Sequence, residues 1–329
     1  MIPKIIGTGS YLPEKRLSNY DLAKMVNTTD EWIYTRTGIK ERHIAAKDEL
    51  TSDLATIAAQ KAIEAAGIEA SSLDMILVAS CTNDLIFPAT ATIVQNKLGI
   101  SNSKIPAYDI SAACSGFIFA ISSAEAYIRG GMAKRILVIG AETMSRIVDW
   151  NDRSTCILFG DGAGAVILEA SGKDGTEAGL ISTHIHSDGS HCSLLQTTGG
   201  VSQGPPHLKS GSGLGFVYMQ GNEVYKQAVK ALGHIVEETL EANNLQREQI
   251  DWLVPHQANI RIIKSTAKRL DMGMDRVILT VEQHGNTSAA SVPIALDVAV
   301  RDGRIKPGQL ILLEAFGAGF TWGSALIRW

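Results

Sequence analysis

The sequence is poor in charge, in aromatic residues and in cysteine. Charged residues make up 19% and aromatic residues 6% of the 329 residues, and there are only four cysteines. Soluble domains usually carry about 25% charged residues, so this chain buries more surface than average, in a deep core or in a subunit interface. Four cysteines without a CxxC pair make no disulfide framework, and we expect a reduced, cytoplasmic protein.

Other classes of function are excluded by what the chain does not contain. The 30 basic residues do not outnumber the 34 acidic residues, so we expect no nucleic-acid partner. No uncharged apolar run reaches the roughly 18 residues that span a membrane. The first residues lack the cationic start and the long apolar run of a signal peptide. The 31 glycines are spread along the chain, which excludes a low-complexity linker.

Apolar runs of strand length alternate with segments of helix length almost throughout the chain. This alternation is typical of an α/β protein. The clearest predicted strands cover residues 75–79, 136–140, 252–254 and 310–314, and an amphipathic helix is predicted over 51–66, ended by Gly67. The stretch 189–215 is rich in Gly, Ser and Pro, and we expect a long exposed loop there.

The second half of the chain echoes the first. Residues 72–78 resemble residues 249–254 at an offset of 177, and residues 127–131 resemble residues 299–303 at an offset of 172. A glycine-rich segment before an apolar run occurs in both halves, at 160–164 and at 317–320. The order and the near-constant offset predict two similar α/β halves, residues 1–172 and 173–329.

Two segments at matching places, 114–130 and 287–303, begin with a turn that has no polar face. A helix without a polar face is buried. Two such helices in corresponding places predict a central helical layer between two sheets, where small residues allow close approach.

Cys114 is the first candidate for chemistry, since it lies between a predicted strand at 105–110 and one of the buried helices. The positive end of a helix favours thiolate over thiol, which would make a nucleophile of this cysteine. A small buried side chain is the other interpretation. We assign only that structural role to Cys81, Cys156 and Cys192.

Asn286 and His256 are candidates in the second half. The offset of 172 carries Cys114 onto Asn286, at the start of the other buried helix, although a helix cap would also explain an asparagine there. His256 directly follows a predicted strand, and the carboxyl end of a strand is where open α/β sheets place ligands. His284 competes for the same role, but a strand end fixes His256 more firmly.

Two further motifs have weaker claims. Three histidines and a cysteine could be imagined as zinc ligands, but no second paired motif exists, and we expect no metal: His184, His186, His191 and Cys192. The glycines at 160–164 lack the lysine and the spacing of a phosphate loop, so tight strand packing explains them better.

Four segments of the sequence together resemble the β-ketoacyl-[acyl-carrier-protein] synthase III family of the thiolase superfamily. They cover residues 29–39, 113–117, 255–259 and 284–288, and the resemblance runs along essentially the whole chain. It implies a thiolase-like five-layer αβαβα fold of two pseudo-symmetric halves, and a homodimer. It also implies that acyl-CoA is a substrate and that no cofactor is needed.

The resemblance implies a role for each candidate. Cys114 would take an acyl group from acyl-CoA as a thioester, and His256 and Asn286 would bind a malonyl-acyl carrier protein and stabilise the enolate formed on decarboxylation. Condensation of the two would start bacterial type II fatty-acid synthesis. The backbone amides of Cys114 and Ala318 would form the oxyanion hole, and many relatives have glycine in place of Ala318.

The remaining site residues are also implied by resemblance. CoA would be held by Trp32 and Arg153 on either side of the adenine, by Arg36 at a phosphate, by Asn222 and Asn259 along the tunnel, and by Thr28 at its mouth. Phe87 would close the acyl pocket from the partner subunit. Arg261, Lys268 and Arg269 make a basic patch that suits an acidic carrier protein, or else a solvated helix face.

Several other protein families differ from this sequence in identifiable residues. Thiolases have a second cysteine near the glycine motif at 316–320, and elongating synthases have histidine where this chain has Asn286. Plant-type polyketide synthases share the three candidates, but the Trp32 region and the chain length favour the initiating enzyme. A secondary-metabolite relative with another starter stays open, as does the starter itself. A papain-like thiol hydrolase would leave the repeat unexplained. A non-catalytic CoA-binding scaffold would leave the three polar candidates without a purpose.

Overall fold

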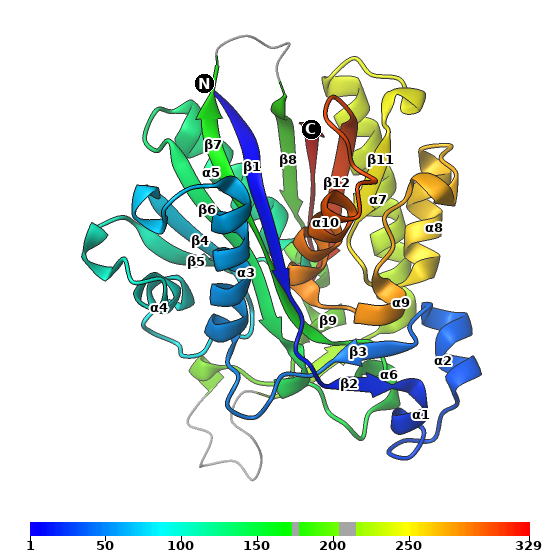
Figure 1. Cartoon of the computed structure of the whole chain (residues 1–329). Coiled ribbons are helices and arrows are strands. Elements are labelled where there is room, and N and C mark those ends of the chain that lie inside the picture. Colours follow the sequence, from blue (N-terminus) through cyan, green and yellow to red (C-terminus); the bar gives the residue numbers. More distant parts are fainter. Residues whose placement is uncertain (173–177, 204–214) are drawn as a thin grey trace.

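The computed structural model describes residues 1–172, 178–203 and 215–329, and two β-sheets form its frame (Figure 1). The first sheet has the order β1 (Ile2–Tyr11), β7 (Asp161–Ser171), β6 (Arg135–Thr143), β4 (Met75–Ala79) and β5 (Ala107–Ile110). The second has the order β8 (Gly179–Ser187), β13 (Thr321–Arg328), β12 (Leu310–Gly317) and β11 (Trp252–Pro255). The four strands predicted from apolar runs are confirmed.

The two sheets repeat one arrangement of strands. The antiparallel pair β1 and β7 corresponds to β8 and β13, the antiparallel pair β7 and β6 to β13 and β12, and the parallel pair β6 and β4 to β12 and β11. β5 pairs with β4, and the corresponding neighbour of β11 is a parallel bridge between Leu253 and Val277. The two similar halves are thus confirmed. Their boundary at 172/173 stays a prediction, because residues 173–177 lie outside the described ranges.

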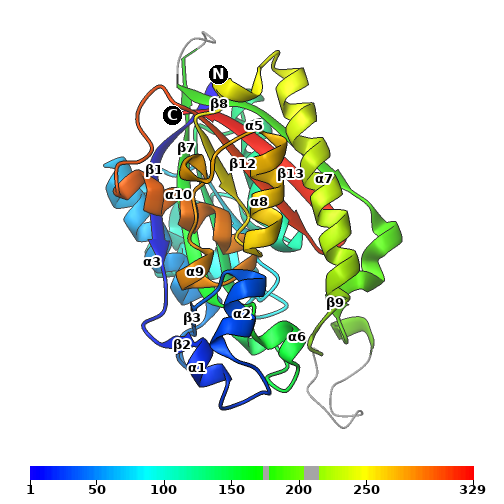
Figure 2. The same ribbon diagram turned by 90° about the vertical axis from the view of Figure 1, so that its right-hand side faces the viewer.

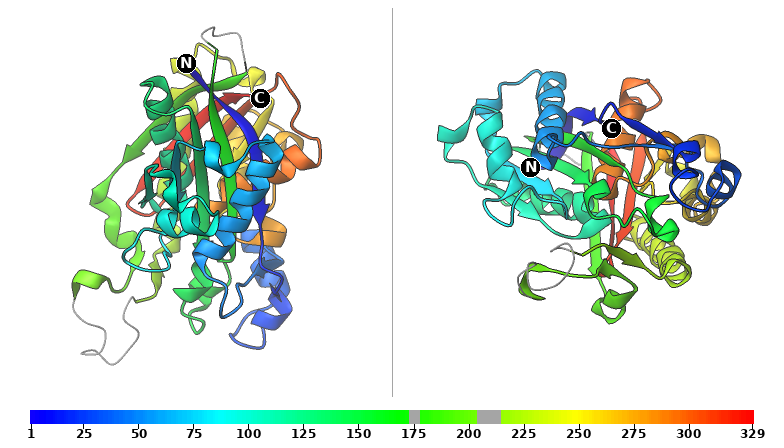
Figure 3. Two further views of the ribbon diagram at one scale, coloured as in Figure 1. Left: turned by 60° about the vertical axis from the view of Figure 1, so that its left-hand side comes forward. Right: turned by 90° about the horizontal axis from the view of Figure 1, so that it is seen from below.

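The helices complete a five-layer αβαβα order. α5 (Gly116–Arg129) and α10 (Ser291–Arg301) lie between the sheets and share one apolar cluster with both of them. α3 (Thr51–Ala66) and α4 (Thr90–Lys97) cover the outer face of the first sheet, and α7 (Gly221–Ala242) and α8 (Ile260–Arg269) cover that of the second (Figure 2). Figure 3 shows the same layers from two further directions. The predicted central helical layer is confirmed.

The central helices approach the first sheet closely at two glycines. A Cβ on Gly140 would lie 2.2 Å from the carbonyl oxygen of Ala289, and one on Gly164 would lie 2.6 Å from the backbone nitrogen of Ile294. Any larger residue would push α10 away from the sheet. Tight packing, rather than phosphate binding, therefore accounts for Gly164.

The offset of 172 holds at the ends of the two central helices but not at their beginnings. The helices end at Arg129 and Arg301, 172 residues apart, whereas the 3₁₀ turns that precede them begin at Ala113 and Ser288, 175 residues apart. The shift arises because α10 has 11 residues and α5 has 14. The structural counterpart of Cys114 is therefore Ala289, and the alignment of Cys114 with Asn286 is wrong.

The shorter elements lie at the ends of these layers. They are β2 (Arg16–Ser18), α1 (Asn19–Leu22), α2 (Asp30–Thr37), β3 (Glu41–His43), α6 (Arg153–Cys156), β9 (Leu195–Thr197), β10 (Val217–Met219) and α9 (Val281–His284). The expected loop at 189–215 holds a 3₁₀ segment, Gly189–Leu194, and then β9, which pairs with β10, so it is not a plain loop; residues 204–214 lie outside the described ranges. In the described parts of the chain, no helix is both long and apolar enough to cross a membrane.

Glu314 on β12 is a buried carboxyl with a consequence for stability. It is 1% exposed, and burial raises its pKa from 4.5 to about 8, although the nearby Thr266 hydroxyl acts in the opposite direction. The folded protein therefore holds a proton that the unfolded chain releases above its ordinary pKa. We expect the free energy of unfolding to fall as pH rises from the ordinary pKa of 4.5 to the folded-state pKa of about 8. The slope is at most about 1.4 kcal/mol per pH unit.

Glu314→Gln should remove this dependence and gain stability relative to the wild type between pH 5 and pH 8. Denaturant unfolding at several pH values measures it, with the exposed Glu248→Gln as control. Parallel stability curves for the wild type and Glu314→Gln would contradict the assignment.

Candidate active site

Cys114 lies in a 3₁₀ turn, Ala113–Ser115, between the end of β5 and the start of α5. Ala113 has a left-handed backbone conformation, with φ 46°, which turns the chain sharply into the helix. A Cβ on Gly317, at the end of β12, would lie 2.7 Å from the Cys114 backbone nitrogen. Cys114 is therefore at the expected position between a strand and a helix, and Gly317 from the second half of the chain packs against its backbone.

Burial dominates the ionisation of Cys114. The residue is 8% exposed, and burial raises the pKa of the thiol to about 12, while a hydrogen bond with the Ser288 hydroxyl acts in the opposite direction. The expectation that the helix start makes a thiolate is therefore wrong. Removing the sulfur from water penalises its charge more than the nearby helix end compensates. The resting side chain is a thiol.

His256 follows β11 and is held as a neutral imidazole. It is 6% exposed, and burial lowers its pKa from 6.5 to about 3. Its Nδ1 lies 2.5 Å from the Ser291 hydroxyl, which also accepts a hydrogen bond from the Gln257 backbone N–H at 3.3 Å. The hydroxyl proton is then free to point at Nδ1, which leaves the imidazole proton on Nε2.

Asn286 is oriented by the backbone that follows it. Its side-chain oxygen accepts a hydrogen bond of 2.9 Å from the Ser288 backbone N–H, and its own backbone N–H donates to the Leu158 carbonyl at 2.8 Å. The amide nitrogen has no acceptor among the described residues. It is therefore available as a donor to a bound molecule.

Cys114, His256 and Asn286 line one cavity of about 300 Å³. Its lining also includes Phe316, the phosphate candidate Arg36, the tunnel candidates Asn222 and Asn259, and Arg261 from α8. His284, the rival histidine, is not in this lining and packs its ring edge-on against His43 at 5.9 Å. The cavity thus joins a thiol, a neutral imidazole and an amide donor.

Two guanidinium groups lie over the ring of the half-buried Trp32. The Arg36 and Arg153 guanidinium carbons are 4.3 Å and 4.6 Å from the centre of the Trp32 ring. Arg153 also donates to the Asn27 carbonyl at 2.8 Å. A base between Trp32 and Arg153 would therefore have to displace the Arg153 guanidinium from the ring.

Thr28, Phe87, Lys268 and Arg269 lie outside the cavity lining, unlike Arg261. Thr28 is half-buried and its hydroxyl has no partner among the described residues, while Phe87 is 83% exposed. On α8, Arg261 stacks over Tyr225 with its guanidinium carbon 5.2 Å from the ring centre. Lys268 and Arg269 are exposed, and Arg269 lies 3.6 Å from a Glu237 oxygen. The basic patch is thus partly neutralised at Arg269.

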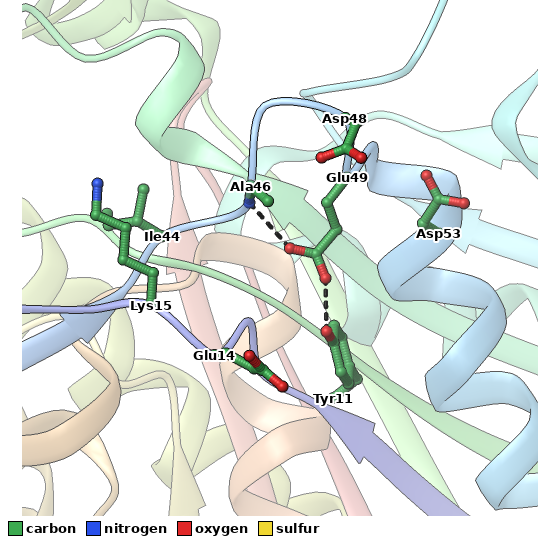
Figure 4. A pocket seen from close by; sticks show the side chains of 8 residues that line it. All are labelled: Tyr11, Glu14, Lys15, Ile44, Ala46, Asp48, Glu49 and Asp53. Carbon is green, nitrogen blue, oxygen red and sulfur yellow. Dashed lines mark hydrogen bonds between the residues drawn. The ribbon is translucent and has the colours of Figure 1, made fainter.

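A second hollow shares no residue with the cavity of Cys114 (Figure 4). In it the Tyr11 hydroxyl donates to Glu49 at 2.5 Å, and Glu49 accepts a second bond from the Ala46 backbone N–H at 3.0 Å. The bond to Glu49 raises the pKa of Tyr11 to about 12. Tyr11 and Glu49 thus bond each other, and no candidate residue lines this hollow.

Three residues around the cavity were not found from the sequence. Ser288 and Ser291 follow Asn286 by two and five residues, and their place in the start of a buried helix was a usable signal. Glu142, a buried carboxylate bonded to Ser288, had only one signal, namely an acid at the end of an apolar run.

Comparisons with known proteins agree with this geometry. A family model described as 3-oxoacyl-[acyl-carrier-protein (ACP)] synthase III matches residues 108–189, and the model of its C-terminal part matches residues 240–329. The β-ketoacyl-[acyl-carrier-protein] synthase III of Thiobacillus denitrificans is 61% identical over 328 residues, which are 99% of each chain. The chain belongs to this family.

Solved structures place this synthase III fold among condensing enzymes. The 3-oxoacyl-[acyl-carrier-protein] synthase III of Aquifex aeolicus has a TM-score of 0.91 at 44% identity and covers 99% of this chain and 100% of its own. The priming β-ketosynthase of the R1128 polyketide pathway has the same TM-score at 34% identity, covering 99% and 96%. The thiolase-like fold and the assignment as a condensing acyltransferase are confirmed. The fold and this assignment together argue against a papain-like hydrolase and against a non-catalytic scaffold.

Proposed function

We propose that this synthase III transfers a short acyl group, such as acetyl, from acyl-CoA to Cys114 and condenses it with malonyl-acyl carrier protein. The products are CoA, carbon dioxide and 3-oxoacyl-acyl carrier protein, the first intermediate of bacterial type II fatty-acid synthesis. The observation that carries the proposal is the single cavity that holds Cys114, His256 and Asn286. The reaction balances without a metal or a redox cofactor, so none is proposed.

In the first half-reaction, the Cys114 sulfur attacks the thioester carbonyl and CoA leaves as its thiol. The tetrahedral oxyanion needs donors that do not move during the reaction. The backbone N–H groups of Cys114 and Ala318 are proposed for this, because neither donates to another described group and Gly317 brings Ala318 next to Cys114.

In the second half-reaction, His256 and Asn286 donate hydrogen bonds to the thioester carbonyl of the malonyl group. As carbon dioxide leaves, negative charge develops on that oxygen, and pre-placed neutral donors stabilise it. The neutral state of His256 and the unpartnered amide of Asn286 both suit this role. The carbanion then attacks the acyl-Cys114 carbonyl and releases the sulfur.

The substrates are proposed to enter along the cavity wall that carries the basic side chains. Arg36, Arg153 and Trp32 would hold the nucleotide of CoA, with Thr28 at the mouth and Asn222 and Asn259 along the pantetheine. The exposed Lys268, with Arg261 and Arg269, offers charge complementary to an acidic carrier protein. We place the protein in the cytoplasm, since its four cysteines are free. The exposed Phe87 fits a homodimer in which it enters the partner's acyl pocket.

Intact-mass spectrometry tests the proposal directly. Incubation with acetyl-CoA should leave one acetyl group on the wild-type chain, and addition of malonyl-acyl carrier protein should remove it as a 3-oxoacyl product. A hydrolase would release acetate without the carrier protein. A panel of acyl-CoA starters then identifies the preferred one, where each methylene changes discrimination by about 1–3 kcal/mol. Absence of any adduct with every starter would refute the proposed function.

Ser291→Ala should weaken decarboxylation while leaving acylation intact. Without the hydroxyl, Nδ1 of His256 loses its partner, so the imidazole no longer keeps its proton on Nε2. We expect about tenfold slower malonyl decarboxylation, equivalent to one lost hydrogen bond. Carbon dioxide release and acyl-enzyme formation are measured side by side, with the buried Ser145→Ala, which bonds Asp161, as control. Equal losses in both half-reactions would refute a role confined to His256.

A further inference from the structure

Glu142, the next-to-last residue of β6, is a fully buried carboxyl group with no basic residue paired to it in the described parts of the chain. It accepts hydrogen bonds from the Cys81 backbone N–H at 3.2 Å, from the Thr82 hydroxyl and from the Ser288 hydroxyl at 3.0 Å. No ion pair joins it to a basic residue within the described ranges. A buried charge held only by such donors is costly to keep, which calls for an explanation from function.

Ser288 connects this carboxylate to the nucleophile. It begins the 3₁₀ turn before α10, where it has a left-handed φ of 49°, and this turn packs against the turn of Cys114. The Ser288 hydroxyl donates to Glu142 at 3.0 Å, and the same hydroxyl adjoins the Cys114 thiol, whose ionised form it favours. The order Cys114 Sγ, Ser288 Oγ, Glu142 Oε1 is that of a proton relay.

His256 is poorly suited to take the thiol proton. Burial opposes its protonation, and its Nδ1 is already occupied by Ser291. The other titratable group facing Glu142 is the Cys81 thiol, which donates to the same carboxylate oxygen at 3.2 Å. Glu142 is therefore the proton acceptor that is separated from Cys114 by a single hydroxyl, that of Ser288. Moving one proton from thiol to carboxylate leaves the total charge of the pair unchanged, so no additional charge is buried.

We propose that Glu142, acting through Ser288, is the positioning residue that holds the Cys114 proton during acyl transfer. This rests on the proposed function. As the Cys114 sulfur forms its bond to the acyl carbon, its proton passes to the Ser288 oxygen, and the Ser288 proton passes to Glu142. When the bond between that carbon and the CoA sulfur breaks, the proton returns through Ser288 to the departing sulfur. Electrons and protons balance, and Glu142 ends as a carboxylate.

A purely electrostatic role would have the opposite effect. The negative charge of Glu142 disfavours a thiolate at Cys114. If charge were its only influence, Glu142→Gln would make Cys114 more reactive at neutral pH. The relay instead requires that Glu142→Gln be less reactive, because an amide does not accept the proton. The direction of the change therefore separates the two roles.

The experiment measures alkylation of Cys114 by iodoacetamide between pH 5.5 and 9.5, with peptide mapping to distinguish Cys81. We expect Glu142→Gln and Ser288→Gly to react at least about tenfold more slowly than wild type at pH 7 and to rise about tenfold per pH unit. The wild type should rise less steeply, and Glu142→Asp should recover part of its rate. Ser288→Gly keeps the other donors to Glu142, and glycine accepts the left-handed φ without strain.

Asp161→Asn is the matched control, because Asp161 is also a fully buried carboxyl bonded to a serine, Ser145. It should keep the wild-type profile. Alkylation as fast as wild type in folded Glu142→Gln or Ser288→Gly would overturn the relay. Acylation by acetyl-CoA is measured separately on the wild type. Failure of that reaction would refute the proposed function, whereas the alkylation profiles would still decide the relay.

Discussion

Cys114→Ala should form no acyl-enzyme and should lose condensation by on the order of 10³-fold or more, as expected when a covalent nucleophile is removed. The decarboxylation of malonyl-acyl carrier protein should persist, because His256 and Asn286 remain in place. Folding should change little, since the thiol contributes one small buried group. Intact-mass spectrometry detects the adduct, and the release of carbon dioxide follows the second half-reaction.

Cys156→Ala provides a matched control, because Cys156 is also buried and free but lies in α6, outside the cavity. It should acylate and condense like the wild type. Persistence of the adduct in Cys114→Ala would refute the assignment. Peptide mapping would then show whether Cys81, which shares Ser288 with Cys114, is the nucleophile instead.

The frame of this fold could be predicted because its determinants are local. β4 is buried along its whole length, so its apolar run is continuous and marks the strand at 75–79. α3 ends at Gly67 in a left-handed conformation, φ 63°, as its cap position requires. The two halves could be recognised since each repeats the same order of local signals. Such features do not depend on distant parts of the chain.

The details of the site could not be predicted because they depend on distances between elements. Equal spacing along the chain does not reveal that α10 is three residues shorter than α5, and this is why a constant offset wrongly pairs Asn286 with Cys114. The thiolate expected at a helix start fails for a related reason. Burial of Cys114 is produced jointly by β12 and by the turn at Ser288, which are far away in sequence. The bond of Glu142 to Ser288 spans 146 residues.

His256→Ala should separate the two half-reactions in the opposite sense. Acylation of Cys114 should continue, because no hydrogen bond joins His256 to the Cys114 sulfur in the described parts of the chain and the imidazole is a poor base at neutral pH. Decarboxylation should fall by about 10²–10³-fold, the usual loss when one donor to a developing oxyanion is removed. Asn286→Ala should show the same pattern, since we propose that its amide donates to the same oxygen.

His284→Asn is the control for this pair, as His284 is buried beside His43 and outside the cavity, and it should keep both half-reactions. The pH dependence adds an independent check. Because burial lowers the pKa of His256 to about 3, the imidazole stays neutral from pH 5 to 8. The rate of decarboxylation should therefore show no change from its titration in that range. A step near pH 6.5 that disappears in His256→Ala would mean that the imidazole is charged on binding. Slow acylation with normal decarboxylation in His256→Ala would reverse the two roles and make this histidine the base for Cys114.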